Sequence, residues 1–168
     1  MKKTQPTPAG AALSAASLDL FRANSLMLAA GDRLVAELGL TSARWQILGA
    51  IAAAERPEPV AWLARDMGAS RQNVQRIVND LNAEGLVEFA ANPHHRRAQL
   101  VVRTPKGRQA FEAAMELAAP WLDNLADGLS VEDLAVFHRV LQALRRKLET
   151  EGETGKPEAA QVPEGADF

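Results

Sequence analysis

The sequence of 168 residues contains no cysteine. This absence excludes disulfide bonds, zinc–thiolate sites, thiol nucleophiles and cysteine-based redox sensing. No run of roughly 18 apolar residues occurs either, so no segment resembles a membrane-spanning helix. The first ten residues, MKKTQPTPAG, carry two lysines but no apolar stretch before the prolines, unlike a secretion signal. We therefore expect a cytoplasmic protein that does not bind membranes.

Motifs that carry catalysis are also missing from the sequence. It has no glycine-rich phosphate loop, no Gly-x-Ser-x-Gly elbow and no spaced cluster of His, Asp and Glu. His94 and His95 could bind a metal together with His138, because imidazole is a common ligand. Adjacent histidines in one turn cannot easily point at one ion, so we interpret them as solvated residues. We expect neither an enzyme nor a bound metal or cofactor.

Charge is distributed unevenly along the chain, whose net charge is −2. From Arg56 to Arg108 there are nine Lys or Arg and five Asp or Glu, so this segment carries +4 and the rest of the chain −6. A basic module in an acidic chain is typical of local nucleic-acid contact. Chance clustering on a solvated face gives the same pattern, so charge alone does not decide between the two.

The length and an apolar content of 47% allow one sizeable core with a helical annex. Residues 1–12 and 150–168 are rich in Pro, Gly, Ala and Glu without apolar periodicity, so we predict two disordered tails, the second one acidic. Apolar residues at helical intervals predict a first helix from Ser14 to Leu38. Thr41 can cap a second helix, which should stop at the RPEP segment, residues 56–59.

Two further helices follow, separated by a sharp turn. The first is short, begins at Pro59 or Val60 and should end at Gly68, because glycine can take the left-handed conformation of such a turn. Ser70 can cap the second, which should reach Asn82. Its apolar residues have the spacing of one buried stripe: Val74, Ile77, Val78 and Leu81. This order is a helix-turn-helix.

Two strand-like runs, residues 86–90 and 100–104, flank an Asn-Pro turn and predict a β-hairpin wing. Residues 39–104 would thus form a winged helix-turn-helix. Thr104 before Pro105 predicts the start of a long helix, and Ser130 predicts the start of a final one. The predicted fold class is mainly α with a small β-hairpin wing, a winged helix-turn-helix joined to a helical region.

Several fragments, taken in order, resemble the MarR family of bacterial transcriptional regulators. They are Leu40-Thr41 with Trp45 four residues on, the helix-turn-helix, Glu84-Gly85-Leu86-Val87, the Arg-containing wing and Thr104-Pro105-Lys106-Gly107. Each fragment is weak alone, but their order and spacing together are specific. The resemblance covers about residues 14–149. It implies a homodimer whose two winged modules bind a pseudo-palindromic operator.

The resemblance also implies that residues 13–38 and 105–149 form a helical dimerisation region. The candidate dimerisation residues are Leu18, Phe21, Trp121, Leu134, Phe137, Leu141 and Leu144. Many such regulators respond to small aromatic or amphipathic ligands, which implies a small-molecule effector. Arg22, Asn24 and Trp45 are candidates for its pocket. Trp45 is as well explained as a core residue, and the other two as a solvated face.

The candidate DNA contacts lie on the second helix of the helix-turn-helix and on the wing. They are Ser70, Arg71, Gln72, Asn73, Gln75, Arg76, His94, His95, Arg96 and Arg97. Near the helix start, Ser70 and Arg71 suit a phosphate, whereas amides and the Arg76 guanidinium suit base edges. Local capping is an alternative role for Ser70 and Asn73. A pair with Asp80 is the alternative for Arg76.

Two wing residues depart from the family pattern. His95 stands where an acid usually pairs with an arginine, and Arg103 stands where an aliphatic residue usually precedes Thr104. Arg96 and Arg97 can still reach phosphates or a narrow minor groove. The sequence therefore predicts a transcriptional repressor that binds double-stranded DNA as a homodimer. The alternative is a winged-helix protein-interaction module without specific DNA binding.

Overall fold

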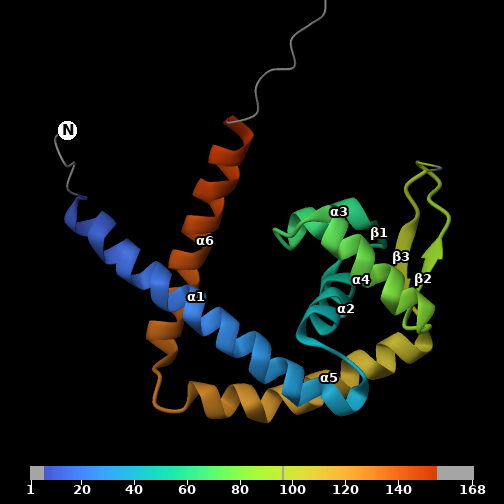
Figure 1. Cartoon of the computed structure of the whole chain (residues 1–168), viewed down its shortest axis with the longest axis horizontal. Helices are drawn as coiled ribbons and strands as arrows, with labels where there is room; N and C mark the ends of the chain where they lie inside the picture. Colours follow the sequence, from blue (N-terminus) through green and yellow to red (C-terminus); the bar gives the residue numbers. More distant parts are fainter. Residues whose placement is uncertain (1–5, 96, 155–168) are drawn as a thin grey trace, which may run out of the picture. The chain divides into compact units, whose positions relative to one another are not determined.

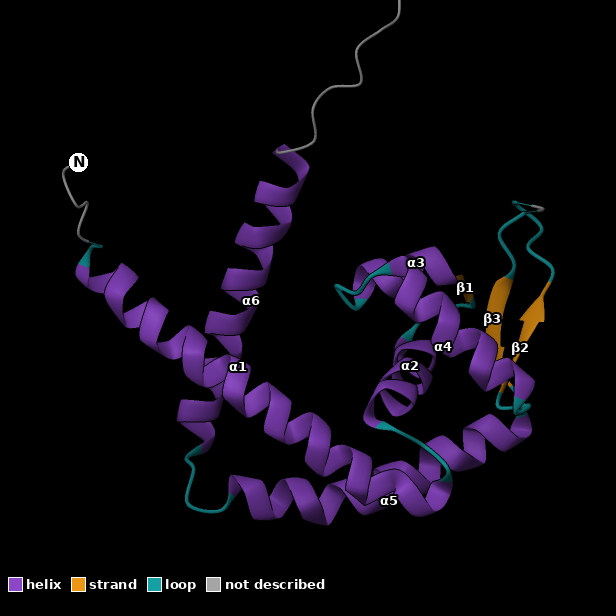
Figure 2. Cartoon of the chain, in the orientation of Figure 1, coloured by secondary structure: helices purple, strands orange, loops and turns teal. Residues whose placement is uncertain are grey.

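A computed structural model of the chain describes residues 6–95 and 97–154. In chain order the elements are α1 (Pro8–Val35), the 3-10 helix η1 (Ala36–Leu38), α2 (Ser42–Ala53), β1 (Glu58–Pro59), α3 (Val60–Asp66), α4 (Arg71–Ala83), β2 (Val87–Ala90), β3 (Leu100–Arg103), α5 (Pro105–Ala126) and α6 (Val131–Thr154) (Figures 1 and 2). The structure is mostly helical with a small antiparallel sheet, which confirms the predicted fold class. It divides into two compact units after Leu122. Among the described residues, no helix combines the length and apolar character needed to cross a bilayer.

The first helix starts earlier than predicted. It begins at Pro8, and the Thr7 side chain accepts a hydrogen bond from the Gly10 backbone N–H at 3.1 Å. The prediction of a disordered tail was therefore wrong for residues 8–12, because Thr7 and Pro8 supply a cap and a proline at the first helical position. Likewise, α6 continues through residues 150–154, which were predicted as tail. Residues 1–5 and 155–168 of the predicted tails lie outside the described residues.

Helices α2 and α4 begin at the capping residues predicted from the sequence. The Thr41 hydroxyl accepts from the Arg44 N–H at 3.3 Å and starts α2. The Ser70 hydroxyl accepts from the Asn73 N–H at 3.4 Å and starts α4. Gly68 has φ of +61°, so the turn between α3 and α4 uses the conformation that favours glycine. The predicted stripe of α4 is buried in the core, with Val74, Ile77, Val78 and Leu81 packed together with α2, α3 and the sheet.

The sheet has three strands, one more than predicted, in the order β1-β3-β2. Glu58 pairs with Val101 and Pro59 with Leu100, so the segment predicted only as a helix stop is also an edge strand. An edge is where proline is tolerated, because it has no N–H to donate to a neighbour. The wing itself is as predicted: β2 and β3 pair antiparallel, from Val87 opposite Arg103 to Ala90 opposite Leu100.

The start of α5 is joined to the base of the wing. The Thr104 hydroxyl accepts from the Gly107 N–H at 3.0 Å and donates to the Gly85 carbonyl at 2.7 Å. Gly107 is buried so closely against Leu86 that an added Cβ would overlap with the Leu86 carbonyl oxygen. This close approach fixes where α5 leaves the winged module.

The second unit contains the end of α5 and α6. Ser130 caps α6 as predicted, accepting from the Asp133 N–H at 3.0 Å and donating to its carboxylate at 2.7 Å. Apolar side chains of α6 remain exposed over its length, from Val131 to Leu148. Exposed apolar side chains along a long helix are typical of a surface that packs against another one.

Candidate nucleic-acid interface and adjoining cavity

The outer face of α4 is polar because the stripe on its inner face is buried. Exposed side chains on this face are Arg71, Gln72, Asn73, Arg76 and Asn79, and Gln75 is half-buried among them. Five of the ten predicted DNA contacts therefore lie on one helix surface, directly after the Ser70 cap. Such a surface offers both charged and amide groups to a groove or a phosphate.

Hydrogen bonds along α4 hold these side chains in place. The Gln75 side-chain amide donates to the Asn79 side-chain oxygen, Oδ1, at 2.9 Å. Arg76 donates to the Asn73 side chain at 3.2 Å and to Asp80 at 3.4 Å, so the predicted alternative partner is present. The Arg76 and Asp80 side chains are 67% and 46% exposed, and a long ion pair in water is worth little. Arg76 can therefore exchange this pair for another acceptor.

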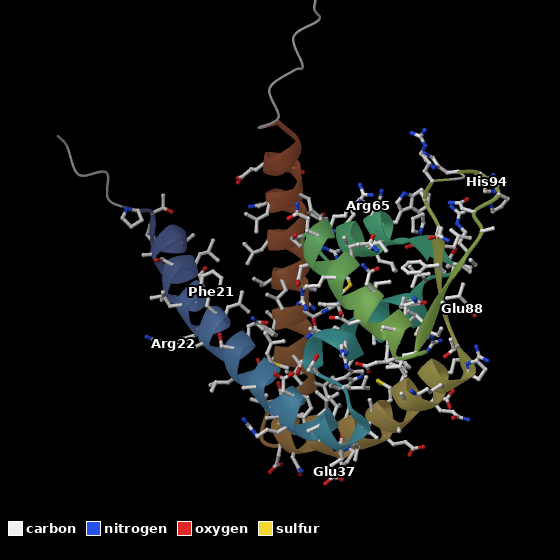
Figure 3. The ribbon with its side chains drawn as sticks, turned by 45° about the vertical axis from the view of Figure 1, so that its right-hand side comes forward. Phe21, Arg22, Glu37, Arg65, Glu88 and His94 are labelled. Atoms are coloured by element: carbon white, nitrogen blue, oxygen red, sulfur yellow. The ribbon has the colours of Figure 1, made fainter. Side chains whose placement is uncertain are left out.

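The wing loop between β2 and β3 contributes the other predicted contacts. His94, at the tip of the wing in Figure 3, is exposed, as are His95 and Arg97. Arg96 lies outside the described residues. Arg97 lines a hollow of about 210 Å³ together with Arg71 and Gln75 of α4. Across the described residues, no three His, Asp or Glu side chains are placed to hold a metal ion.

Asn92 holds the wing loop, a role that sequence analysis did not assign to its side chain. Its amide donates to the Ala98 carbonyl at 2.9 Å, and its side-chain oxygen accepts from the His94 N–H at 3.0 Å. The second unusual wing residue, Arg103, lies 5.2 Å from the centre of the Phe111 ring, a cation–π contact with α5. Arg103 thus joins the wing base to α5.

A cavity of about 380 Å³ lies between α1, α2 and α5 within the first unit. It is lined by Asn24, Met27, Leu28, Gly31, Ser42, Trp45, Gln46, Gly49, Phe111, Met115, Trp121 and Leu122. We call it the helical cavity. Two predicted pocket residues, Asn24 and Trp45, line it, and so does Trp121, predicted for dimerisation. Arg22 does not, and its exposed side chain pairs with Asp19 at 3.5 Å.

The wall of the helical cavity between α1 and α2 is tightly built. The buried Ser42 hydroxyl donates to the Leu28 carbonyl at 2.7 Å, and the Ser42 N–H donates to the Asp32 carboxylate at 2.6 Å. A Cβ on Gly31 would lie 2.5 Å from the Ser42 hydroxyl oxygen, so a larger residue there would displace that hydroxyl. All lining residues of this cavity are described, and none carries a charged side chain.

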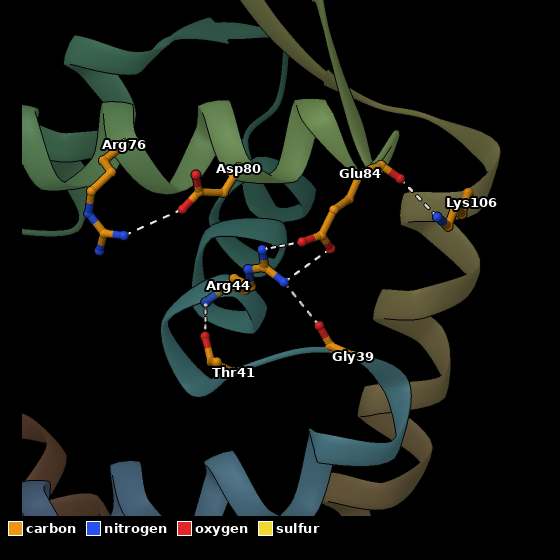
Figure 4. Close-up of polar contacts among 7 residues, drawn as sticks. All are labelled: Gly39, Thr41, Arg44, Arg76, Asp80, Glu84 and Lys106. Atoms are coloured by element: carbon orange, nitrogen blue, oxygen red, sulfur yellow. Dashed lines mark hydrogen bonds and ion pairs between the residues drawn. The ribbon is translucent and has the colours of Figure 1, made fainter.

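Polar contacts connect the walls of this cavity to the end of α4 (Figure 4). Arg44 of α2 donates to both carboxylate oxygens of Glu84, at 3.0 Å to Oε2, and to the Gly39 carbonyl at 3.1 Å. Lys106 of α5 donates to the Glu84 carbonyl at 2.8 Å. Sequence analysis assigned no role to these side chains, because the Arg44–Glu84 pair spans 40 residues.

Comparison with known sequences identifies relatives, among them a transcriptional regulator. Residues 38–98 match the family model described as MarR family. An uncharacterized protein of Mycobacterium tuberculosis is 37% identical over 130 residues, covering 77% of this chain and 87% of its own. Transcriptional activatory protein BadR of Rhodopseudomonas palustris is 30% identical over 133 residues, covering 74% of each chain.

Solved structures show the same fold. Transcriptional regulator PA3341 is 27% identical with a TM-score of 0.71, over 80% of this chain and 98% of its own. CouR from Rhodococcus jostii RHA1, solved bound to p-coumaroyl-CoA, has a TM-score of 0.68 at 21% identity, over 74% of this chain and 87% of its own. With the winged helix-turn-helix and the sequence relatives, this likeness establishes that the chain belongs to the MarR family of transcriptional regulators.

Proposed function

We propose that the protein is a homodimeric repressor that binds a pseudo-palindromic operator in the cytoplasm, has no catalytic activity, and is released by a small ligand. DNA binding is supported mainly by the polar face of α4, which lies beside Arg97 of the wing. The buried stripe on the opposite side of the helix holds this face outward. A helix presented in this way can enter a major groove while the wing reaches the neighbouring backbone.

In this proposal, some residues position the protein on the DNA backbone and others recognise the bases. The start of α4, with Ser70 and Arg71, suits a phosphate because its free N–H groups and dipole are positive. The amides of Gln72 and Gln75 match adenine edges, and the Arg76 guanidinium matches guanine. In this proposal the wing cation, Arg97, contacts phosphates and adds affinity without sequence preference.

Exposed apolar side chains support the homodimer. Leu18 is 57% exposed and Phe21 67% on α1 (Figure 3), and Phe137 is 53% exposed on α6. Leu134 is also exposed, and Leu141 and Leu144 are half-buried. Side chains of this size left in water on two long helices are typical of an unformed subunit interface. Two-fold symmetry would then place the two α4 helices about 34 Å apart, one DNA turn.

The helical cavity supports an effector and indicates its class. Its walls are aromatic and aliphatic, with Trp45, Phe111 and Trp121 among them and no charged side chain. Burying an unpaired carboxylate there would be costly, so we propose a neutral aromatic molecule. CouR was solved with p-coumaroyl-CoA, an aromatic ligand, which supports an aromatic effector for this chain as well.

The test is binding of the purified protein to its own upstream DNA, measured by gel shift at several salt concentrations. We expect a salt-sensitive band at dimer concentrations below micromolar, because cationic contacts release counterions. A scrambled duplex of equal length is the control. No salt-sensitive band would favour the protein-interaction alternative. BadR is named as an activator, so repression needs a test of its own. In a promoter–reporter fusion, deletion of the gene for this protein should raise expression of the reporter. Lower expression would indicate an activator.

A further inference from the structure

A second, larger cavity of about 610 Å³ lies between the wing loop, β1 and α3. It is lined by Arg56, Pro57, Pro59, Trp62, Asn92, Pro93, His94, His95, Ala98 and Leu100. We call it the wing cavity. It shares no lining residue with the helical cavity and none with α4, so it is separate from the proposed effector site and from the polar face of α4.

The wing cavity contains a cation held against an aromatic ring. Trp62 is 41% exposed, and the Arg56 guanidinium lies 5.7 Å from its ring centre. Arg65 lies 5.6 Å from the same ring but pairs with Asp66 at 3.1 Å and does not line the cavity. Within the described residues, Arg56 has no carboxylate partner. Its charge is therefore available to an anion, and the indole face keeps it in place.

Much of the remaining wall is apolar and stiff, and Asn92, His94 and His95 are its polar part. Pro57, Pro59, Pro93 and Leu100 supply rings and branched chains, and proline has little conformational freedom to lose when a ligand binds. On the wing side, the two hydrogen bonds of Asn92 fix the loop that carries His94. A largely apolar cavity with a few polar groups is the usual composition of a small-molecule site.

We propose that the wing cavity binds a small aromatic anion. Its carboxylate or phosphate would pair with Arg56 and accept a hydrogen bond from a wing imidazole, and its ring would pack on Trp62 and the prolines. The helical cavity offers no cation, so it would select the neutral form and the wing cavity the anionic form of similar molecules. Because His94 and His95 belong to the wing, an occupied cavity would also restrict the loop proposed to approach DNA.

The three tryptophans allow the two cavities to be observed separately. Trp62 lines the wing cavity, whereas Trp45 and Trp121 line the helical cavity. The three indole N–H signals of the full-length protein can be resolved by NMR and assigned with single Trp→Phe variants. We would titrate 2-naphthoate and, as the neutral counterpart, 2-naphthamide. Naphthoate should shift the Trp62 signal, and naphthamide should bind there at least tenfold more weakly, because it lacks the charge-assisted pair.

Arg56→Gln should weaken naphthoate binding at Trp62 about tenfold. The control is Arg65→Gln, because Arg65 contacts the same indole ring but does not line the cavity. It should change naphthoate affinity less than about twofold. Unchanged spectra elsewhere would show that each variant is folded. Naphthoate shifts confined to Trp45 and Trp121, or equal affinity for wild type and Arg56→Gln, would overturn the proposal. So would a Trp62 signal that does not respond to naphthoate at all. Since the titration contains no DNA, its outcome is independent of operator binding.

Discussion

Arg44, in the first turn of α2, and Glu84, the residue that ends α4, form a bidentate ion pair (Figure 4). Lys106 of α5 contacts the backbone of the same glutamate. Since α2 and α5 are also walls of the helical cavity, the end of α4 is held by both of them. A ligand that separates these walls would move α4, provided that it binds the two arrangements with different affinity.

The Arg44–Glu84 pair should contribute measurably to stability. The Arg44 side chain is only 20% exposed, and Glu84 is 46% exposed. We expect a coupling free energy of about 1 kcal/mol from a double-mutant cycle of Arg44→Met and Glu84→Gln, measured by urea unfolding. The exposed Arg76–Asp80 pair is the matched control, for which about 0.3 kcal/mol is expected. Equal coupling in the two cycles would show that the bidentate pair is no better than a surface pair.

Gly107 should tolerate no side chain. Gly107→Ala would force a methyl group into the Leu86 carbonyl and separate α5 from the wing base. We expect a loss of about 3 kcal/mol in the free energy of unfolding, the cost of overpacking a rigid site. Gln109→Ala, at an exposed position of the same helix, should be within about 0.5 kcal/mol of wild type. Wild-type stability for Gly107→Ala would mean that the wing base and α5 can shift freely.

Local signals in the sequence predicted most of the helical starts. Thr41, Ser70, Thr104 and Ser130 act as caps in the structure, because a cap depends on residues within one turn. The same Thr-Pro pattern that predicted α5 is present at Thr7, so the true start of α1 was available from the sequence. For residues 8–12 this local cap signal is therefore more informative than a composition rich in proline, glycine and alanine.

Contacts between segments that are distant in the sequence could not be predicted from local signals. The edge strand β1 forms because Pro59 meets Leu100, and nothing near Pro59 indicates that partner. The wing cavity similarly needs Trp62 and His94 from different elements, and nothing near either residue in the sequence indicates the other. Of the three predicted pocket residues, Asn24 and Trp45 line the helical cavity and Arg22 does not, since helical periodicity cannot distinguish a cavity wall from an open face.

A single substitution should change which ligand charge the helical cavity prefers. Naphthamide should shift the Trp45 and Trp121 signals more strongly than naphthoate, because the cavity offers no cation. Gln46→Lys places an ammonium group among the lining residues and should move the preference roughly fivefold toward naphthoate, as expected for a partly exposed ion pair. Gln72→Lys, on α4 outside the cavity, is the control and should leave the preference unchanged. A wild-type protein that prefers naphthoate at these two tryptophans would contradict the proposed neutral effector.

Arg76 and Arg97 should affect DNA binding in different ways. Arg76→Ala should cost about 1–3 kcal/mol of operator affinity and relax selectivity at one base position, because a bidentate contact to a base edge is lost. Arg97→Ala should weaken operator and scrambled duplexes alike and lower the salt dependence, because it removes a phosphate contact. Asp80→Ala frees Arg76 from its pair without removing it, so operator affinity should stay equal or rise. Fluorescence anisotropy with duplexes substituted at each position measures all three. If Arg76→Ala lost affinity for every duplex equally, Arg76 would be a backbone contact and the assignment of α4 as the reading element would rest on Gln72 and Gln75 alone.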